Sequence, residues 1–109
     1  MFKIIKNREF THDVPVMVPS DGGHSEEILR CRFRAVPQSD LMDFDLATDD
    51  GTRGWLRAVC VSFPEVADEQ GQLIPMSDQL RDDVLGSTFI QIALIRHYTL
   101  AMSKARVGN

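Results

Sequence analysis

Apolar and polar residues alternate along the first third of the chain. Between residues 10 and 18 the apolar positions of one face are Phe10, Val14, Val16 and Val18. They alternate with positions of the opposite face, which include Thr11, Asp13, Pro15 and Met17. A period of two predicts a half-buried strand. Pro15 has no N–H to donate to a neighbouring strand, so this strand is expected at a sheet edge or to be irregular there. Residues 19–25, PSDGGHS, predict a loop.

A second strand is predicted just before Pro37. One face of it carries Leu29, Cys31, Phe33 and Ala35, and the other carries Arg30, Arg32 and Arg34. The short apolar segment FKII at residues 2–5 precedes both strands and is separated from them by a turn, KNRE. The first third therefore predicts an antiparallel sheet of about three strands with one solvated face.

The rest of the chain has apolar residues at helical spacing. Ser39, Ser77 and Ser87 are suitable N-caps, and Pro64 ends the second helical segment. TDDGTRG at residues 48–54 predicts a loop. The predicted helices cover residues 40–46, 54–63, 78–85 and 88–106, and the last is the longest.

Strands followed by helices predict an α+β fold, with the helices packed on one face of the sheet. The length of 109 residues suits one domain, 1–109, with a β-rich part (1–36) and a helical part (37–109).

Composition and charge narrow the function. Sixteen acidic and twelve basic residues give a net charge of -4, which argues against binding along a nucleic-acid backbone. Two separated cysteines at apolar positions predict buried thiols in a reducing cytoplasm. No apolar run reaches the roughly 20 residues that span a bilayer, and the N-terminus lacks the apolar segment of a signal peptide.

The sequence offers no motif for catalysis or for ion binding. Centring a calcium loop on Gly51 would make Leu46 and Arg57 its first and last ligands, and centring it on Gly71 would make Val66 the first. The histidines and cysteines are scattered without zinc-ligand spacing, and no activated nucleophile motif is present. We therefore expect no enzyme and no catalytic, cofactor-binding or metal-binding residues, and no small-molecule substrate.

The long C-terminal helix carries two apolar surfaces. A broad stripe, expected to pack on the domain itself, contains Ile90, Leu94, Tyr98, Ala101, Met102 and Ala105. A second patch contains Phe89, Ala93 and Leu100, with Arg96 on one side and His97 and Lys104 on the other. Such a patch is either a partner surface or part of the core, covered by residues 80–85 or by the N-terminal strands. Phe89, Ala93, Arg96 and Leu100 are the candidate partner-binding residues.

Two stretches of the C-terminal half carry a family resemblance: WLRAVCVSFPEVADEQGQLIPMSDQLRDDVL at residues 55–85 and IALIRHYTLAMSKARVGN at residues 92–109. They resemble the small tail assembly chaperones of long-tailed bacteriophages and prophages. In that family an apolar helix ends in an aromatic residue, usually Trp. An acidic joint follows, then an aliphatic-Pro-aromatic-Ser helix start and a final helix with Ala and Tyr. The matching elements here are residues 56–63, Val66, Asp68, Glu69, Gly71, Pro75, Ser77, Leu80, Leu85, Tyr98, Ala101, Gly108 and Asn109.

This chain departs from the family pattern at three positions. Phe63 stands where Trp is usual, Met76 stands where Phe is usual, and Pro64 lies inside the joint. Residues 66–80 are expected to join two helices rather than to bind a ligand, with Val66, Leu73 and Ile74 held against the core.

The resemblance implies a non-enzymatic assembly factor in the host cytoplasm. Such proteins bind the tape measure protein, help to recruit tail tube subunits and are absent from the mature virion; a homo-oligomer is possible. The alternatives are a structural tail completion or connector protein, or a small regulatory adaptor. No nucleic acid, membrane or cofactor is expected among its partners.

Overall fold

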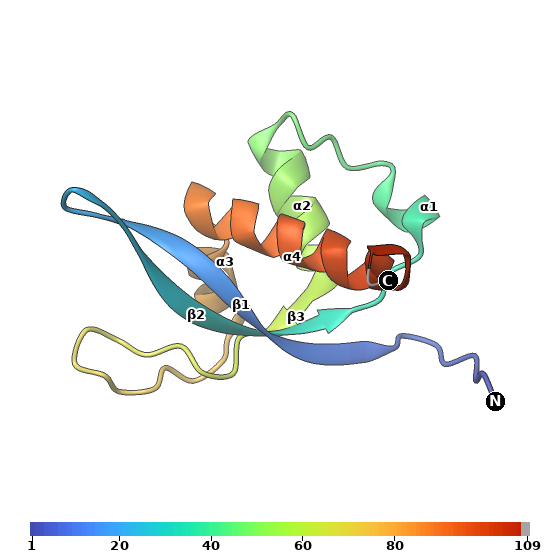
Figure 1. Ribbon diagram of the computed structural model, residues 1–109, viewed down its shortest axis with the longest axis horizontal. Coiled ribbons are helices and arrows are strands. Elements are labelled where there is room, and N and C mark those ends of the chain that lie inside the picture. The colour runs from blue at the N-terminus through green and yellow to red at the C-terminus, as the bar shows by residue number, and fades with distance from the viewer. Residues whose placement is uncertain (108–109) are drawn as a thin grey trace.

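The computed structural model describes residues 1–107, with side chains to Ser103. Its elements are β1 (Glu9–Ser20), β2 (Gly23–Arg34), α1 (Gln38–Leu41), α2 (Asp49–Val59), β3 (Cys60–Ser62), α3 (Asp78–Val84) and α4 (Thr88–Val107). The strands form one antiparallel sheet in the order β1-β2-β3, and α4 crosses one face of it (Figure 1). The predicted α+β fold, with a small antiparallel sheet covered by C-terminal helices, is confirmed.

The long hairpin of β1 and β2 dominates the sheet. It pairs Phe10 with Phe33 and Val14 with Leu29, and its two strands are connected by Asp21 and Gly22 alone. Gly22 has φ 77°, which a residue without a side chain adopts readily. The predicted loop at residues 19–25 was therefore too long, because a tight Asp-Gly turn lets both strands continue almost to the tip.

The third strand is not the predicted one. Residues 2–5 form no strand, whereas Cys60–Ser62, predicted as the end of a helix, pair with β2 at Arg32 and Phe33. A helix through residue 63 and a strand at Cys60–Ser62 would both bury Cys60, so the pattern of apolar residues could not distinguish the helix from the strand.

Helix α2 also begins earlier than predicted. Thr48 caps it by accepting a hydrogen bond from the Gly51 N–H at 2.9 Å, so most of the predicted TDDGTRG loop is helical. The helix ends at Val59, and β3 follows directly.

The core lies between the sheet and the helices α2 and α4. Its fully buried side chains are Val14, Cys31, Phe33, Leu56, Val59, Cys60, Phe63, Leu85 and Leu94. The Tyr98 hydroxyl of α4 donates to the Arg34 carbonyl at 3.1 Å and accepts from the Val36 N–H at 3.0 Å. These two hydrogen bonds fasten the helix to the end of β2.

The predicted apolar stripe of α4 is only partly buried. Leu94 and Tyr98 lie in the core and Ile90 is half-buried, but the Met102 side chain is 48% exposed. Met102 was wrongly expected in the core, because it lines an open pocket between α4 and the segment at Val36 and Gln38. Ala105 lies outside the residues whose side chains are described.

Both cysteines are free and buried, as predicted. Their thiols lie close together. The hydrogen bond with Cys60 is the main reason that the pKa of Cys31 is raised, and burial of the thiol is the second.

Residues 66–74 form a hairpin-like loop between β3 and α3 rather than a joint between two helices. The Asp68 carboxylate accepts hydrogen bonds from the N–H groups of Gln70 and Gln72, both at 2.9 Å, and Gly71 has φ 81°. Val66 and Ile74 are half-buried. Leu73 is 68% exposed, contrary to expectation, because its segment pairs with Ala67 at the free end of the loop.

The molecule exposes more surface than is usual for a compact monomer of its mass. Its accessible surface is 7735 Å², whereas a monomer of 12.3 kDa is expected to expose about 6,100 Å². The hairpin tip, the loop at residues 66–74 and the N-terminal segment all project from the body (Figure 1). These projections leave apolar side chains exposed that a compact monomer would cover.

Candidate partner-binding groove

An open groove lies between α4 and the outer half of the hairpin. Its volume is about 440 Å³, and we call it the hairpin groove. It is lined by Phe89, Ile92, Ala93, Arg96, His97 and Leu100 of α4, and by Pro15, Met17, His24 and Glu26 of the hairpin. The four residues predicted from the sequence, Phe89, Ala93, Arg96 and Leu100, therefore lie in one site.

The groove has a half-buried floor and an exposed apolar rim. Phe89 and Ala93 are half-buried and pack against the core, while Met17, Ile92 and Leu100 are between 51% and 53% exposed. The inner part of the predicted patch contacts the domain, and its outer part faces solvent, which leaves a partner surface as a prediction. The sequence did not indicate the contribution of the hairpin. Met17, an apolar residue on the polar side of its strand, was the available signal.

Histidine side chains hold α4 against β1 beside this groove. His12 Nδ1 and His97 Nε2 lie 2.9 Å apart in a hydrogen bond, and the His97 ring stacks on Phe33 with centroids 5.9 Å apart. His97 therefore has a structural role at the wall of the groove. Lys104, predicted to flank the patch, lies outside the residues whose side chains are described.

The free edge of β1 next to the groove is poorly suited to accept another strand. Ala35 N–H donates to the Arg8 carbonyl at 2.8 Å, so Arg8 and Ala35 form a hydrogen-bonded pair at the end of the β1-β2 ladder. Such pairs alternate along an antiparallel ladder, which places Pro15 and Pro19 among the residues whose backbone nitrogens face the open edge. Prolines there remove two of the donors that an added strand would need. The groove is consequently better suited to a helix than to a strand.

The arginines on the outer face of the sheet are neutralised by nearby acids. Arg32 pairs with Glu9 at 2.7 Å, and Arg30 lies 3.8 Å from Glu65 and 3.9 Å from Asp13. This face therefore offers little free positive charge to a phosphate backbone. Within the described residues, no cluster of three His, Cys, Asp or Glu side chains could hold a metal ion.

A comparison of the chain with protein-family models, curated proteins and solved structures finds no significant match. Among residues 1–107, no helix is both long and apolar enough to cross a membrane. The geometry alone describes the site: it is an apolar groove with a charged rim, built from one helix and one hairpin.

Proposed function

We propose that this protein is a non-enzymatic tail assembly chaperone of a long-tailed bacteriophage or prophage. In this proposal it binds the tape measure protein in the host cytoplasm, keeps it soluble, helps to recruit tail tube subunits and is absent from the mature virion. The observation that carries the proposal is the hairpin groove, which presents half-exposed apolar side chains on a framework fixed by the core. Such a surface is typical of a site for another polypeptide.

Two of the departures from the family pattern are in contact with each other. The Phe63 N–H points at the Met76 sulfur at 3.4 Å, so the positions usually occupied by Trp and Phe meet at the base of the joint. The contact is made by the backbone of Phe63 and not by its ring, so it can form with any aromatic residue at that position.

The acidic loop at residues 66–74 has a structural explanation. Asp68 accepts two backbone hydrogen bonds, and Gly71 provides the left-handed turn. These two matches to the family pattern shape the loop and need no ligand.

The expected client is an apolar helical segment of the tape measure protein. Its side chains would lie between Phe89 and Leu100 of α4 and Met17 of the hairpin, and the prolines of β1 disfavour an added strand. At the rim, Arg96 would contact acidic groups of the client, and Glu26 would contact basic groups.

Co-expression with the tape measure protein of the same genome tests the proposal. Leu100→Glu places a charge in the groove, and we expect the soluble fraction of the tape measure protein to fall at least about fivefold. Leu73→Glu is the matched control, because it changes an exposed leucine to the same residue on a loop away from the groove. Equal solubilisation by the two variants would refute the role of the groove.

Analysis of purified particles separates the chaperone from a structural tail protein. A chaperone should be missing from particles whose assembly requires it, whereas a completion or connector protein should remain in them at fixed stoichiometry.

A further inference from the structure

The segment that precedes β1 is basic and carries uncovered apolar side chains. Met1, Phe2 and Ile4 are among the most exposed apolar residues, with Phe2 at 86% and Ile4 at 92%. Residues 1–8, which we call the arm, contain Lys3, Lys6 and Arg8 and no acidic residue. In the structure the arm extends away from the sheet at the end opposite the hairpin tip (Figure 1).

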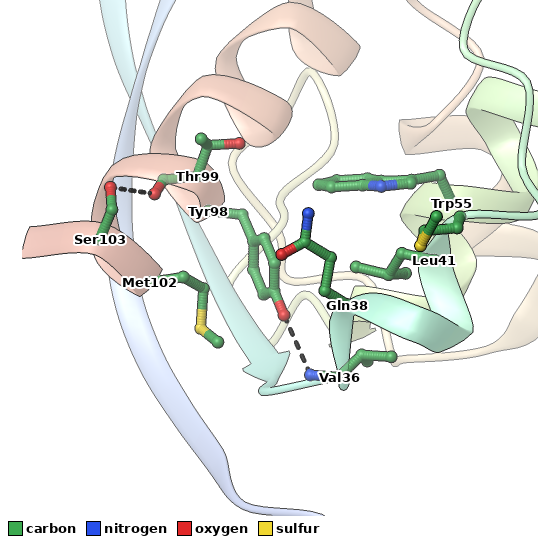
Figure 2. Close-up of a pocket in the computed structure, with 9 residues that line it drawn as sticks. Val36, Gln38, Leu41, Trp55, Tyr98, Thr99, Met102 and Ser103 are labelled. Carbon is green, nitrogen blue, oxygen red and sulfur yellow. Dashed lines mark hydrogen bonds between the residues drawn. The ribbon is translucent and has the colours of Figure 1, made fainter.

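The same end of the molecule carries an open pocket with an aromatic wall. Figure 2 shows Trp55 and Tyr98 on either side of Gln38, with Leu41 beside Trp55 and Met102 near the opening. The pocket has a volume of about 520 Å³, which is enough for a large and a medium apolar side chain together. Met42 and Met102 at its rim are 76% and 48% exposed. We call it the aromatic pocket; it is separate from the hairpin groove.

The charges beside this pocket are opposite to those of the arm. Residues 38–50, which include α1 and contribute three residues to the pocket lining, contain five aspartates and no basic residue. Asp40 and Asp43, next to the lining residues Leu41 and Met42, are exposed and form no ion pair within the described part of the chain. An apolar pocket with an acidic border is complementary to a segment that carries Phe2 and Ile4 together with Lys3 and Lys6.

We propose that the aromatic pocket receives the arm of a second copy of this chain. Phe2 and Ile4 enter the pocket, and Lys3 and Lys6 face the acidic border. Because the arm and the pocket lie at the same end of the molecule, two copies related by a twofold axis can exchange arms, and each pocket is then filled. The resulting dimer covers Phe2 and Ile4 of both chains.

Local contacts favour exchange over insertion into the arm's own pocket. The Arg8 guanidinium donates to the Lys3 carbonyl at 2.7 Å and lies 5.8 Å from the centroid of the Phe2 ring. Asn7 has φ 55°, which turns the chain immediately before β1. Ile5, Lys6 and Asn7 line a shallow pocket of their own chain that includes Asp40, so the base of the arm is held there, whereas Phe2 and Ile4 stay uncovered and can reach a neighbour.

Analytical ultracentrifugation of the full chain provides the first test. We expect the wild type to sediment as a dimer of the 12.3 kDa chain at micromolar concentration. The arm variant Phe2→Ser with Ile4→Ser should raise the dissociation constant at least about 100-fold, since two apolar anchors are lost. The pocket variant Met42→Asp should weaken the dimer in the same direction. A matched control, Ile28→Ser with Leu73→Ser, removes two exposed apolar side chains that line neither the aromatic pocket nor the hairpin groove, and it should leave the dimer unchanged.

Trp55 is the only tryptophan and lines the aromatic pocket, so its fluorescence reports occupancy directly. A synthetic peptide of residues 1–8 added to the arm variant should shift the emission with a one-to-one stoichiometry. The same peptide carrying Phe2→Ser and Ile4→Ser should not.

Three results would overturn the proposal. They are a monomeric wild type, a dimer unaffected by the arm variant, and a peptide that leaves Trp55 emission unchanged. A monomer whose Trp55 emission changes on mutation of its own arm would mean insertion within one chain. None of these outcomes depends on the tape measure protein, so they leave the proposed function to its own test.

Discussion

Replacing Phe33 by Asp tests how the sheet faces the core. The Phe33 ring is fully buried, and its centroid lies 5.4 Å from that of Phe10 and 5.7 Å from that of Tyr98. Truncating a buried Phe costs about 3–5 kcal/mol, and burying a carboxylate without a partner adds several kcal/mol more. The sum is comparable with the whole unfolding free energy of a domain, about 5–15 kcal/mol. We expect Phe33→Asp to be unfolded at ambient temperature.

Arg32→Glu is the matched control on the opposite face of the same strand. The Arg32 side chain is 45% exposed, and its ion pair with Glu9 is of the solvent-accessible kind, so reversing the charge should cost only about 1 kcal/mol. A conservative variant, Phe33→Leu, should lose about 1–2 kcal/mol and remain folded. Urea unfolding followed by far-ultraviolet circular dichroism measures all three. Equal destabilisation by Phe33→Asp and Arg32→Glu would contradict the assigned faces of β2.

Two further predictions concern the titratable core groups. Cys31 and Cys60 should react with a thiol reagent slowly in the native protein and rapidly in denaturant, and fast native labelling of either would contradict their burial. Native packing raises the pKa of Cys31, chiefly through Cys60, and burial raises that of Tyr98. The unfolded chain releases these protons near the ordinary pKa values of 9.0 and 10.0 while the native chain keeps them, so the unfolding free energy should fall as pH rises through this range. Tyr98→Phe should make that decline shallower in urea titrations at successive pH values, and an identical pH profile for the variant would exclude the tyrosine as a cause.

Local periodicity was sufficient to predict the two long strands and the long helix. Alternation fixed the faces of β1 and β2, and the capping serine at residue 77 marked the start of α3, where its Oγ accepts from the Leu80 N–H at 3.0 Å. These features depend on neighbours within a few residues, which a sequence displays directly.

The remaining features depend on long-range contacts. Cys60–Ser62 form a strand because β2 offers them an edge, although their apolar spacing equally suits a helix. The candidate groove was predicted only on its α4 side, because Pro15, Met17, His24 and Glu26 reach it through the twist of the hairpin. The sequence shows which side chains are apolar, but not which distant segment lies beside them.

The position of α4 at the end of the described chain has a consequence for folding during synthesis. The β1-β2 hairpin is local in sequence, and such hairpins form in about 1–10 μs, long before a ribosome supplies the next residue at about 5–20 residues per second. Its apolar face, including Val14 and Phe33, is covered by Leu94 and Tyr98, which are translated about 60 residues after β2. For several seconds the nascent chain therefore exposes the apolar residues of this hairpin, which by itself is only marginally stable. During that interval it requires the kind of protection from aggregation that we propose the finished protein gives to its client.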